Sequence, residues 1–208
     1  YQVIDEMNRV GMMVDISHVS IQCMMQATEY SKAPVIASHS GVWELAKNQR
    51  NLNDDQLKAV GAANGVVQIV GLDGFVKHYP EKSAEVAALR AAAAAAAGDA
   101  GWDRSKHAGS AEYMAGMEAI DVKYPPANVK DFVDHIEHAV NLIGVDHVGI
   151  VSDFDGGGGL EGWNSAAETM NVTAELVARG YSEEDIGKIW SGNTLALWRR
   201  VDAVAAGL

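Results

Sequence analysis

The sequence is poor in cysteine and in long hydrophobic runs. Its 208 residues include one cysteine, Cys23, which excludes an internal disulfide framework and any cysteine-rich zinc finger. Cys23 lies in an apolar helical stretch, so we expect its thiol to be buried. The longest low-complexity run is the alanine stretch 91–97, which is too short and too weakly hydrophobic to span a bilayer. The sequence therefore predicts no membrane span.

Basic residues are also scarce. Sixteen Lys and Arg residues face 28 Asp and Glu residues, which gives a net charge of −12. Proteins bind duplex nucleic acid and anionic membranes by neutralising phosphates with basic side chains. Both are therefore poor partners for this chain, and we expect no nucleic-acid partner.

The chain has enough apolar residues, 48% of the total, to fold around a core. It opens at Tyr1 within an amphipathic helical pattern and has no apolar signal region. We therefore expect it to start partway through a protein. Any targeting signal would lie upstream of Tyr1, so the choice between bacterial cytoplasm and periplasm stays open.

Short apolar runs alternate with helical patterns along the chain. This order predicts an α/β fold with a parallel sheet. The segment 71–128 breaks the alternation and ends in Pro125-Pro126, and we interpret it as a partly helical insertion within a single domain, 1–208. The expected strands are 12–17, 34–37, 66–70 and 147–152, and the expected helices are 1–9, 21–30, 53–65, 129–143, 166–180 and 182–201.

Two of the expected strands end at the same dipeptide. Ser17-His18 lies at the end of the apolar run of the first strand, and Ser38-His39 directly follows the second. Right-handed crossovers bring the carboxyl ends of parallel strands to one edge of a sheet, where α/β proteins place their sites. Two imidazoles at such an edge suit a divalent metal, and zinc most readily.

The last expected strand ends in two candidate carboxylates. Asp153 lies on the same face as Val151 and is still on the strand, whereas Asp155 lies two residues further on. We favour Asp153, which could ligate a metal and move a proton. A satisfied structural role is the competing interpretation for each of these residues.

Four blocks of sequence together resemble the membrane dipeptidase (renal dipeptidase) family of zinc peptidases. Two shorter segments also fit, 134–138 and 191–193, and all occur in the family's order over nearly the whole chain. The resemblance implies the C-terminal portion, about strands 5 to 8, of a metal-dependent amidohydrolase-type (β/α)8 TIM barrel. The four blocks are 11–20, 34–40, 50–55 and 147–156.

The resemblance also implies a role for each candidate residue. His18 and His39 would ligate one of two zinc ions, and Asp153 would lie at the other as ligand and general base. Arg50 matches the position that binds the substrate's carboxylate. The implied reaction is hydrolysis of small dipeptides by metal-activated hydroxide, often with tolerance for a D-residue at the C-terminal side.

The family's N-terminal zinc ligands have no counterpart here. These are a His-x-Asp pair on the first strand and a bridging Glu, and a substrate-contacting His is absent as well. The chain would thus supply part of the ligands and would need the missing N-terminal half of the barrel as a partner. The alternatives to a dipeptidase are a non-catalytic remnant or binding module of the same fold and another amidohydrolase activity. Relatives are commonly homodimers, so a homodimer is a possible assembly.

Three further features are interpreted without a catalytic role. His135 and His138 lie three residues apart on an expected helix, and we expect surface or packing roles because they precede a strand rather than end it. The glycines 156–159 lack the Gly-Lys-Ser/Thr of a phosphate loop, so we expect a mobile loop. Asp54 and Asp55 are interpreted as helix N-terminal charges.

Overall fold

The computed structural model describes residues 1–207, which form two compact units. The first unit comprises residues 1–77 and the chain from Ala127 onward, and the second comprises His78–Pro126. The second unit lies inside the segment 71–128 that the sequence analysis treats as an insertion. No helix in the described part of the chain is long and apolar enough to cross a membrane.

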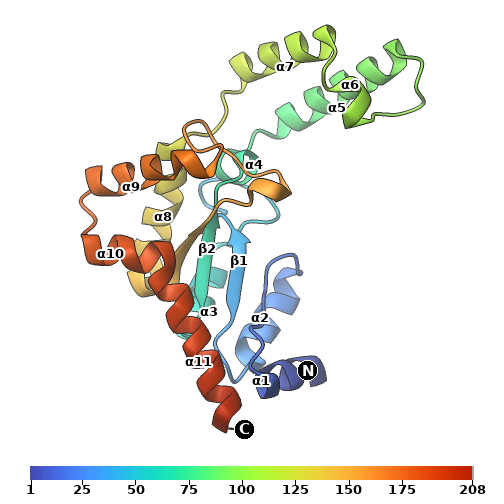
Figure 1. Ribbon diagram of the computed structural model, residues 1–208. Coiled ribbons are helices and arrows are strands. Elements are labelled where there is room, and N and C mark those ends of the chain that lie inside the picture. The colour runs from blue at the N-terminus through green and yellow to red at the C-terminus, as the bar shows by residue number, and fades with distance from the viewer. Residues whose placement is uncertain (208) are drawn as a thin grey trace. The chain divides into compact units, whose positions relative to one another are not determined.

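A three-stranded parallel sheet forms the centre of the first unit (Figure 1). Its strands are β1 (Ile36–Ser40), β2 (Val66–Val70) and β3 (Val148–Val151), in that spatial order. β2 is central, and its Val-Val-Gln-Ile-Val sequence is the β-branched pattern of a strand buried on both faces. All three strands point the same way, so their carboxyl ends meet at one edge.

Helices cover the sheet, and their ends are set by local sequence signals. α3 (Asp54–Ala62) and α8 (Val129–Ile143) each begin with a capping box, formed by Asn53 with Gln56 and by Asn128 with Asp131. The other elements of this unit are α1 (Gln2–Val10), α2 (Ile21–Tyr30), α4 (Asp73–Val76), α9 (Thr169–Ala178), α10 (Glu183–Gly187) and α11 (Asn193–Gly207), with the 3-10 turns Val145–His147, Phe154–Gly156 and Ala166–Glu168 and the π-helical turn Lys188–Gly192.

The core lies between the sheet and these helices. Val67 and Ile69 of β2 are fully buried, and they belong to the same cluster as Leu57 of α3 and Phe132 and Ile136 of α8. The first helix, α1, packs against the last helix, α11. Figure 1 places the two chain ends at the same end of the first unit.

The prediction of a strand over residues 12–17 is wrong. This segment forms a single bridge, Asp15 with Ile36, rather than a strand. Two backbone hydrogen bonds join it to β1, from Ile16 N to Ile36 O at 2.8 Å and from Ile36 N to Val14 O at 3.0 Å. The segment is paired on one side only, and it turns at Ser17 directly after the bridge, so the ladder stops.

The prediction that the Cys23 thiol is buried is also wrong, because this side chain is exposed. α2 buries Met24, Ala27 and Thr28. Residue 23 precedes Met24 by one position, and one position on a helix is a rotation of about 100°. An apolar helical stretch therefore does not place every one of its small residues in the core.

The second unit is helical. Its helices are α5 (Pro80–Ala96), α6 (Arg104–His107) and α7 (Ala111–Lys123). α5 and α7 pack closely, because the missing side chain of Gly116 leaves room for Leu89. Trp102 contacts Tyr113, with ring centroids 4.5 Å apart and the rings tilted, and the buried residues of this unit are Ala94, His107, Ile120 and Tyr124.

Candidate functional site

The structure places His18 and His39 side by side at the carboxyl edge of the sheet. Their Nε2 atoms are 2.6 Å apart, and their ring centroids are 4.7 Å apart. His39 lies on β1, which extends to Ser40 and so includes the Ser-His dipeptide that the expected strand 34–37 left outside. His18 lies in the turn after the Asp15 bridge.

The backbone at the site is held in an uncommon conformation. Three non-glycine residues have a positive φ in the described chain, and two of them are His18 (φ 65°) and Asp153 (φ 53°). Such conformations cost about 1–3 kcal/mol each and persist where the surroundings impose them, often at functional sites. Two candidate site residues therefore share a backbone conformation that, among the described non-glycine residues, only Asn64 also adopts.

A hydrogen-bonded chain runs from Asp15 to the ring of His39. The Asp15 carboxylate accepts from the Ser38 hydroxyl at 2.6 Å, and the Ser38 Oγ is 2.7 Å from His39 Nδ1. Burial acts to raise the pKa of Asp15, but hydrogen bonds from Ser38 and Ser17 outweigh it and lower that pKa. Asp15 is thus an anion held by donors, which the sequence analysis gave no role.

The electrostatics of His18 link it to the other candidates. Desolvation lowers the pKa of His18, and the positive charge of Arg50 and the neighbouring His39 lower it further. The carboxylates of Asp15 and Asp153 act in the opposite direction. The net effect is a lowered pKa, which favours the neutral imidazole that a metal requires.

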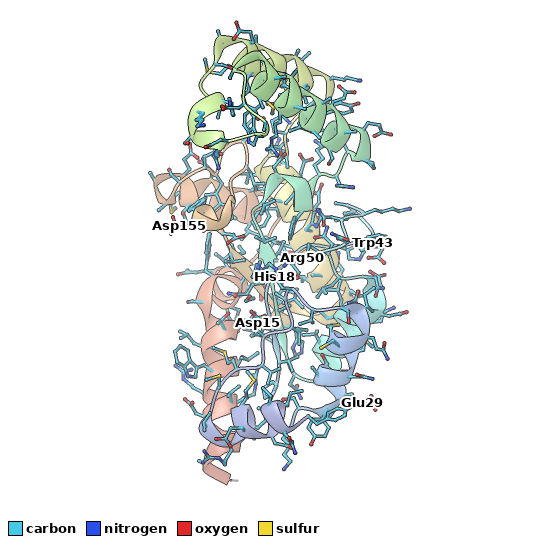
Figure 2. The ribbon with its side chains drawn as sticks, turned by 90° about the vertical axis from the view of Figure 1, so that its right-hand side faces the viewer. Asp15, His18, Glu29, Trp43, Arg50 and Asp155 are labelled. Carbon is cyan, nitrogen blue, oxygen red and sulfur yellow. The ribbon has the colours of Figure 1, made fainter. Side chains whose placement is uncertain are left out.

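Arg50 lies beside His18, and one of its nitrogens has no partner. Both residues line a small cavity of about 20 Å³, and Figure 2 shows them together. The Arg50 guanidinium lies over the ring of Phe75, 5.3 Å from its centroid. Among residues 1–207, its Nη2 is the one buried side-chain nitrogen or oxygen without a hydrogen-bond partner. A buried unpaired donor is costly, and a carboxylate would satisfy it.

The loop that carries Arg50 is pinned by Asn51, which is buried. Its Oδ1 accepts from Gly41 N at 2.9 Å, and its Nδ2 donates to the carbonyls of Ala46 and Phe75, each at 2.8 Å. The carbonyl groups and the N–H come from three separate stretches of chain. Asn51 therefore holds Arg50 in place, and sequence reasoning missed it because a single Asn carries no signal of its buried partners.

Asp153 follows β3 and is enclosed by the glycine loop 156–159. The N–H groups of Gly156 and Gly158 donate to its carbonyl oxygen at 3.0 and 2.7 Å. A side chain at Gly156 would collide with its carboxylate. Asp155 is exposed, and Figure 2 shows it well apart from His18. The carboxylate of Asp153, and not that of Asp155, is among the charges that act on the pKa of His18.

The glycine loop is anchored rather than free at its end. Gly159 N donates to Gly71 O at 2.7 Å, and Gly159 forms a parallel bridge with Leu72. The loop is thus bonded to Asp153 through Gly156 and Gly158 and to the Gly71 segment through Gly159. Its mobility stays a prediction.

The residues expected to pack do so. His135 is buried on α8, where its Nδ1 accepts from Val42 N at 2.9 Å and its Nε2 donates to Val76 O at 3.0 Å. Burial lowers the pKa of His135 to about 4. Both ring nitrogens are used, so His135 has no free ligand atom.

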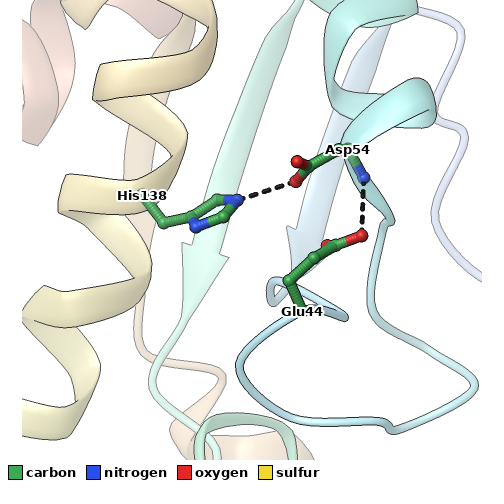
Figure 3. A group of neighbouring side chains, drawn as sticks. All are labelled: Glu44, Asp54 and His138. Carbon is green, nitrogen blue, oxygen red and sulfur yellow. Dashed lines mark hydrogen bonds and ion pairs between the residues drawn. The ribbon is translucent and has the colours of Figure 1, made fainter.

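A second group of possible metal ligands lies where α8 faces the start of α3 (Figure 3). It comprises Glu44, Asp54 and His138, with ligand atoms within 4.8 Å of one another. His138 Nε2 is 2.7 Å from Asp54 Oδ1, and Asp54 N donates to Glu44 Oε1 at 3.1 Å. The hydrogen bond from His138 lowers the pKa of Asp54. These atoms already satisfy one another, so the group links two helices.

The sheet edge offers another set of possible metal donors. It offers two imidazole nitrogens that face each other, with an aspartate whose charge acts on one of them. Imidazole and carboxylate are ligands of zinc and of other first-row divalent metals. His18 and His39, together with Asp153, are thus a second set of side chains that could contribute ligands to a metal, besides Glu44, Asp54 and His138.

Comparisons with known proteins identify the family of this chain. A model of the membrane dipeptidase family, peptidase family M19, matches residues 1–208. A dipeptidase of Claviceps purpurea, tcpJ, is 32% identical over 98% of this chain, which covers 38% of that protein. An uncharacterised dipeptidase of Schizosaccharomyces pombe is 31% identical and is covered to 40%. The chain thus spans about two-fifths of the length of these curated relatives.

Solved structures give the same fold. The probable dipeptidase PvdM of Pseudomonas aeruginosa superposes with a TM-score of 0.78 at 35% identity, over 98% of this chain and 54% of PvdM. A metallopeptidase of Rhodobacter sphaeroides, solved with a phosphinate mimic of L-Ala-D-Ala, superposes with a TM-score of 0.70 at 24% identity, over 96% of this chain and 45% of that one. The parallel α/β arrangement is that of a partial TIM barrel, as the sequence predicts. This chain belongs to the membrane dipeptidase family, peptidase family M19.

Proposed function

We propose that the chain forms the C-terminal half of the active site of a zinc-dependent dipeptidase. The observation that carries the proposal is the unpartnered Nη2 of Arg50 in the same cavity as His18, whose ring meets that of His39. An anion-binding group beside two metal-ligating groups suits a small substrate with a free carboxylate. Dipeptides are such substrates.

His18, His39 and Asp153 are the proposed metal ligands. When bound, the metal polarises the peptide carbonyl and activates water for attack. Zinc is the proposed ion because neutral imidazole is among its preferred ligands. The lowered pKa of His18 supports this role, because the ring stays neutral at the pH at which a ligand must be unprotonated.

Arg50 is the proposed carboxylate-binding residue. Its guanidinium is planar and offers paired donors that match a carboxylate. Asn51 and the ring of Phe75 fix its position before substrate arrives. The substrate's C-terminal carboxylate would thus set the distance from Arg50 to the peptide bond, which limits the site to short peptides.

Asp153 is the proposed general base. Its carboxylate would take a proton from the attacking water and deliver it to the amine nitrogen that leaves. The fold supports this role because the glycine loop holds Asp153 through its carbonyl oxygen, which leaves the side chain for chemistry. The remaining family ligands would come from the N-terminal half of the barrel, so we expect the 208 residues alone to bind metal weakly and to turn over slowly.

The experiment compares dipeptides with and without a free carboxylate. With zinc added, L-Ala-L-Ala and L-Ala-D-Ala are each compared with their C-terminal amides, for binding by calorimetry and for hydrolysis. We expect the free acids to bind at least about 10-fold more tightly, since a hydrogen bond to a charged group contributes about 1.5–3 kcal/mol. The preference should vanish in Arg50→Met and remain in Arg9→Met, a surface control. Equal binding of acid and amide would contradict the proposal.

The same measurements separate the alternatives. A binding module would bind zinc and would bind dipeptides through their carboxylate, but it would not hydrolyse them. This result is decisive if hydrolysis stays absent after the N-terminal half of a relative's barrel is supplied. Hydrolysis of L-Ala-D-Ala at a rate close to that of L-Ala-L-Ala would support tolerance for a D-residue. That tolerance is proposed because the family resemblance implies it.

A further inference from the structure

Asp15 is hydrogen-bonded more extensively than a surface carboxylate needs to be. Its Oδ1 accepts from the backbone N–H groups of Ser17 at 3.0 Å and Ser38 at 3.1 Å. Its Oδ2 accepts from the Ser38 hydroxyl at 2.6 Å. The donors come from the turn before His18 and from the strand that carries His39. One carboxylate therefore ties together the two segments that bear the histidines.

The protons in this chain can be placed by counting donors. An ionised carboxylate is only an acceptor, so the single hydroxyl proton of Ser38 is directed to Asp15. The Ser38 Oγ can then only accept from His39 Nδ1, which lies 2.7 Å away. A neutral imidazole with its proton on Nδ1 has its lone pair on Nε2. That is the atom of His39 that faces His18.

We propose that Asp15, acting through the hydroxyl of Ser38, is a positioning residue that holds His39 in the Nδ1–H tautomer, with Nε2 directed to the metal. The inference rests on the proposed function, since it assigns a purpose to the ring that the metal site uses. Metal-bound histidines commonly donate their second N–H to a carboxylate or carbonyl. Here a serine hydroxyl connects the ring to the carboxylate.

The strand that carries His39 is irregular at this point. The pairing of β1 with β2 is irregular between Ala37 and Ser40, and His39 lies within this irregular stretch. Irregularities of this kind re-aim side chains near active sites. The backbone N–H of His39 is held as well, because it donates to the Ser17 hydroxyl at 3.1 Å. Ring and backbone are thus both fixed toward the Asp15 segment.

His18 is held differently. Within residues 1–207, its ring has one hydrogen-bond contact, the 2.6 Å approach to His39. Its orientation therefore depends on the His39 ring and on its own strained backbone. The Asp15 network consequently positions both imidazoles, one directly and one through the other.

The test uses three variants and two readouts. Ser38→Ala removes the link, Ser38→Thr keeps the hydroxyl as the matched control, and Asp15→Asn gives Ser38 an amide donor that turns its proton toward His39. The first readout is the zinc affinity of the 208-residue chain, measured by competition with a chromophoric chelator, with the cobalt(II) absorption spectrum as a report on ligand geometry. The second is the tautomer of His39 in the metal-free chain, read from the ring ¹⁵N shifts.

We expect Ser38→Ala and Asp15→Asn to lower zinc affinity about 10–100-fold and to alter the cobalt spectrum, with Ser38→Thr close to the original chain. The ¹⁵N shifts should report Nδ1–H for His39 in the original chain and in Ser38→Thr, and a mixture or Nε2–H in Asp15→Asn. Circular dichroism checks that each variant folds.

Two outcomes would overturn the inference. One is an Nε2–H tautomer for His39 in the original chain. The other is an unchanged affinity and spectrum in both Ser38→Ala and Asp15→Asn. Failure of the proposed function gives a different result, because the original chain would then bind no zinc. The tautomer of His39 in the metal-free chain would still test the inference in that case.

Discussion

Two pairs of histidines in this chain have opposite surroundings. His135 and His138 on α8 have partners supplied by the fold itself, two backbone groups for the first and Asp54 for the second. His18 and His39 at the sheet edge meet each other through their Nε2 atoms. Residue type does not distinguish the pairs, although their positions relative to the expected strands do. The difference lies in whether the surrounding fold already satisfies the ring nitrogens.

The largest expected effect is the loss of His135. His135→Ala leaves the Val42 N–H and the Val76 carbonyl unpaired in the core, and each such group costs about 1–3 kcal/mol. We expect the free energy of unfolding to fall by about 2–5 kcal/mol in urea titrations. His135→Gln, which retains an acceptor and a donor, should recover part of the loss. A fall below about 0.5 kcal/mol in His135→Ala would mean that the ring is not a structural link.

The stability should also depend on pH through His135. Its folded pKa of about 4 lies below the ordinary value of 6.5 because of burial, so the unfolded chain binds more protons between these values. Stability is then fully present above about pH 6.5 and is lost as the pH falls toward 4, by about 3 kcal/mol at 1.36 kcal/mol per pKa unit. Urea titrations at several pH values should give this slope, and His135→Gln should flatten it. An equal slope in both proteins would contradict the assignment.

At the sheet edge, the expected effect is on metal binding rather than on folding. His39→Ala should lower zinc affinity by at least about 100-fold, since even the loss of a residue that hydrogen-bonds a metal ligand lowers metal affinity 10–100-fold. His138→Ala in the same chelator competition should change zinc affinity less than about 3-fold. If His138→Ala lowers the affinity as much as His39→Ala does, the group of Glu44, Asp54 and His138 is the metal site and our assignment of the two pairs is reversed.

The smallest expected effect is the stability change in His138→Ala. The ion pair with Asp54 is partly exposed, with 27% and 35% of the two side chains accessible, and such pairs contribute about 0–1 kcal/mol. We expect the free energy of unfolding to fall by less than about 1 kcal/mol, and Asp54→Asn to give a similar value. A loss above about 2 kcal/mol would place His138 with His135 as a core residue.

Several elements could be predicted because their signals are local. α2 begins after Ser20, and α8 begins at the Asn128 capping box and ends at Gly144. β2 coincides with a β-branched run bounded by Gly65 and Gly71. The meeting of two Ser-His strand ends followed from the handedness of crossovers. Each of these inferences needs only neighbouring residues or a general rule of topology.

Other features depended on partners far away in the sequence. The segment 12–17 looks like a strand, but it pairs with β1 at one residue and then turns. Cys23 looks like a core thiol, but its helix buries the adjacent position instead. The link from Asp15 to His39 joins residues 24 positions apart. The burial of Arg50 depends on Asn51 and Phe75. No local sequence pattern predicts either feature.

The sequence by itself determined the class of fold, the elements with strong caps or β-branched runs, and the family to which the chain belongs, because periodicity, capping and motif order are properties of neighbouring residues. The tertiary structure alone decided which polar atoms have partners. It paired both nitrogens of His135, joined His138 to Asp54, and left Nη2 of Arg50 unpaired beside two facing imidazoles. A hydrogen bond is satisfied or not by atoms brought together in space, and the residues that supply them here lie up to 93 positions apart.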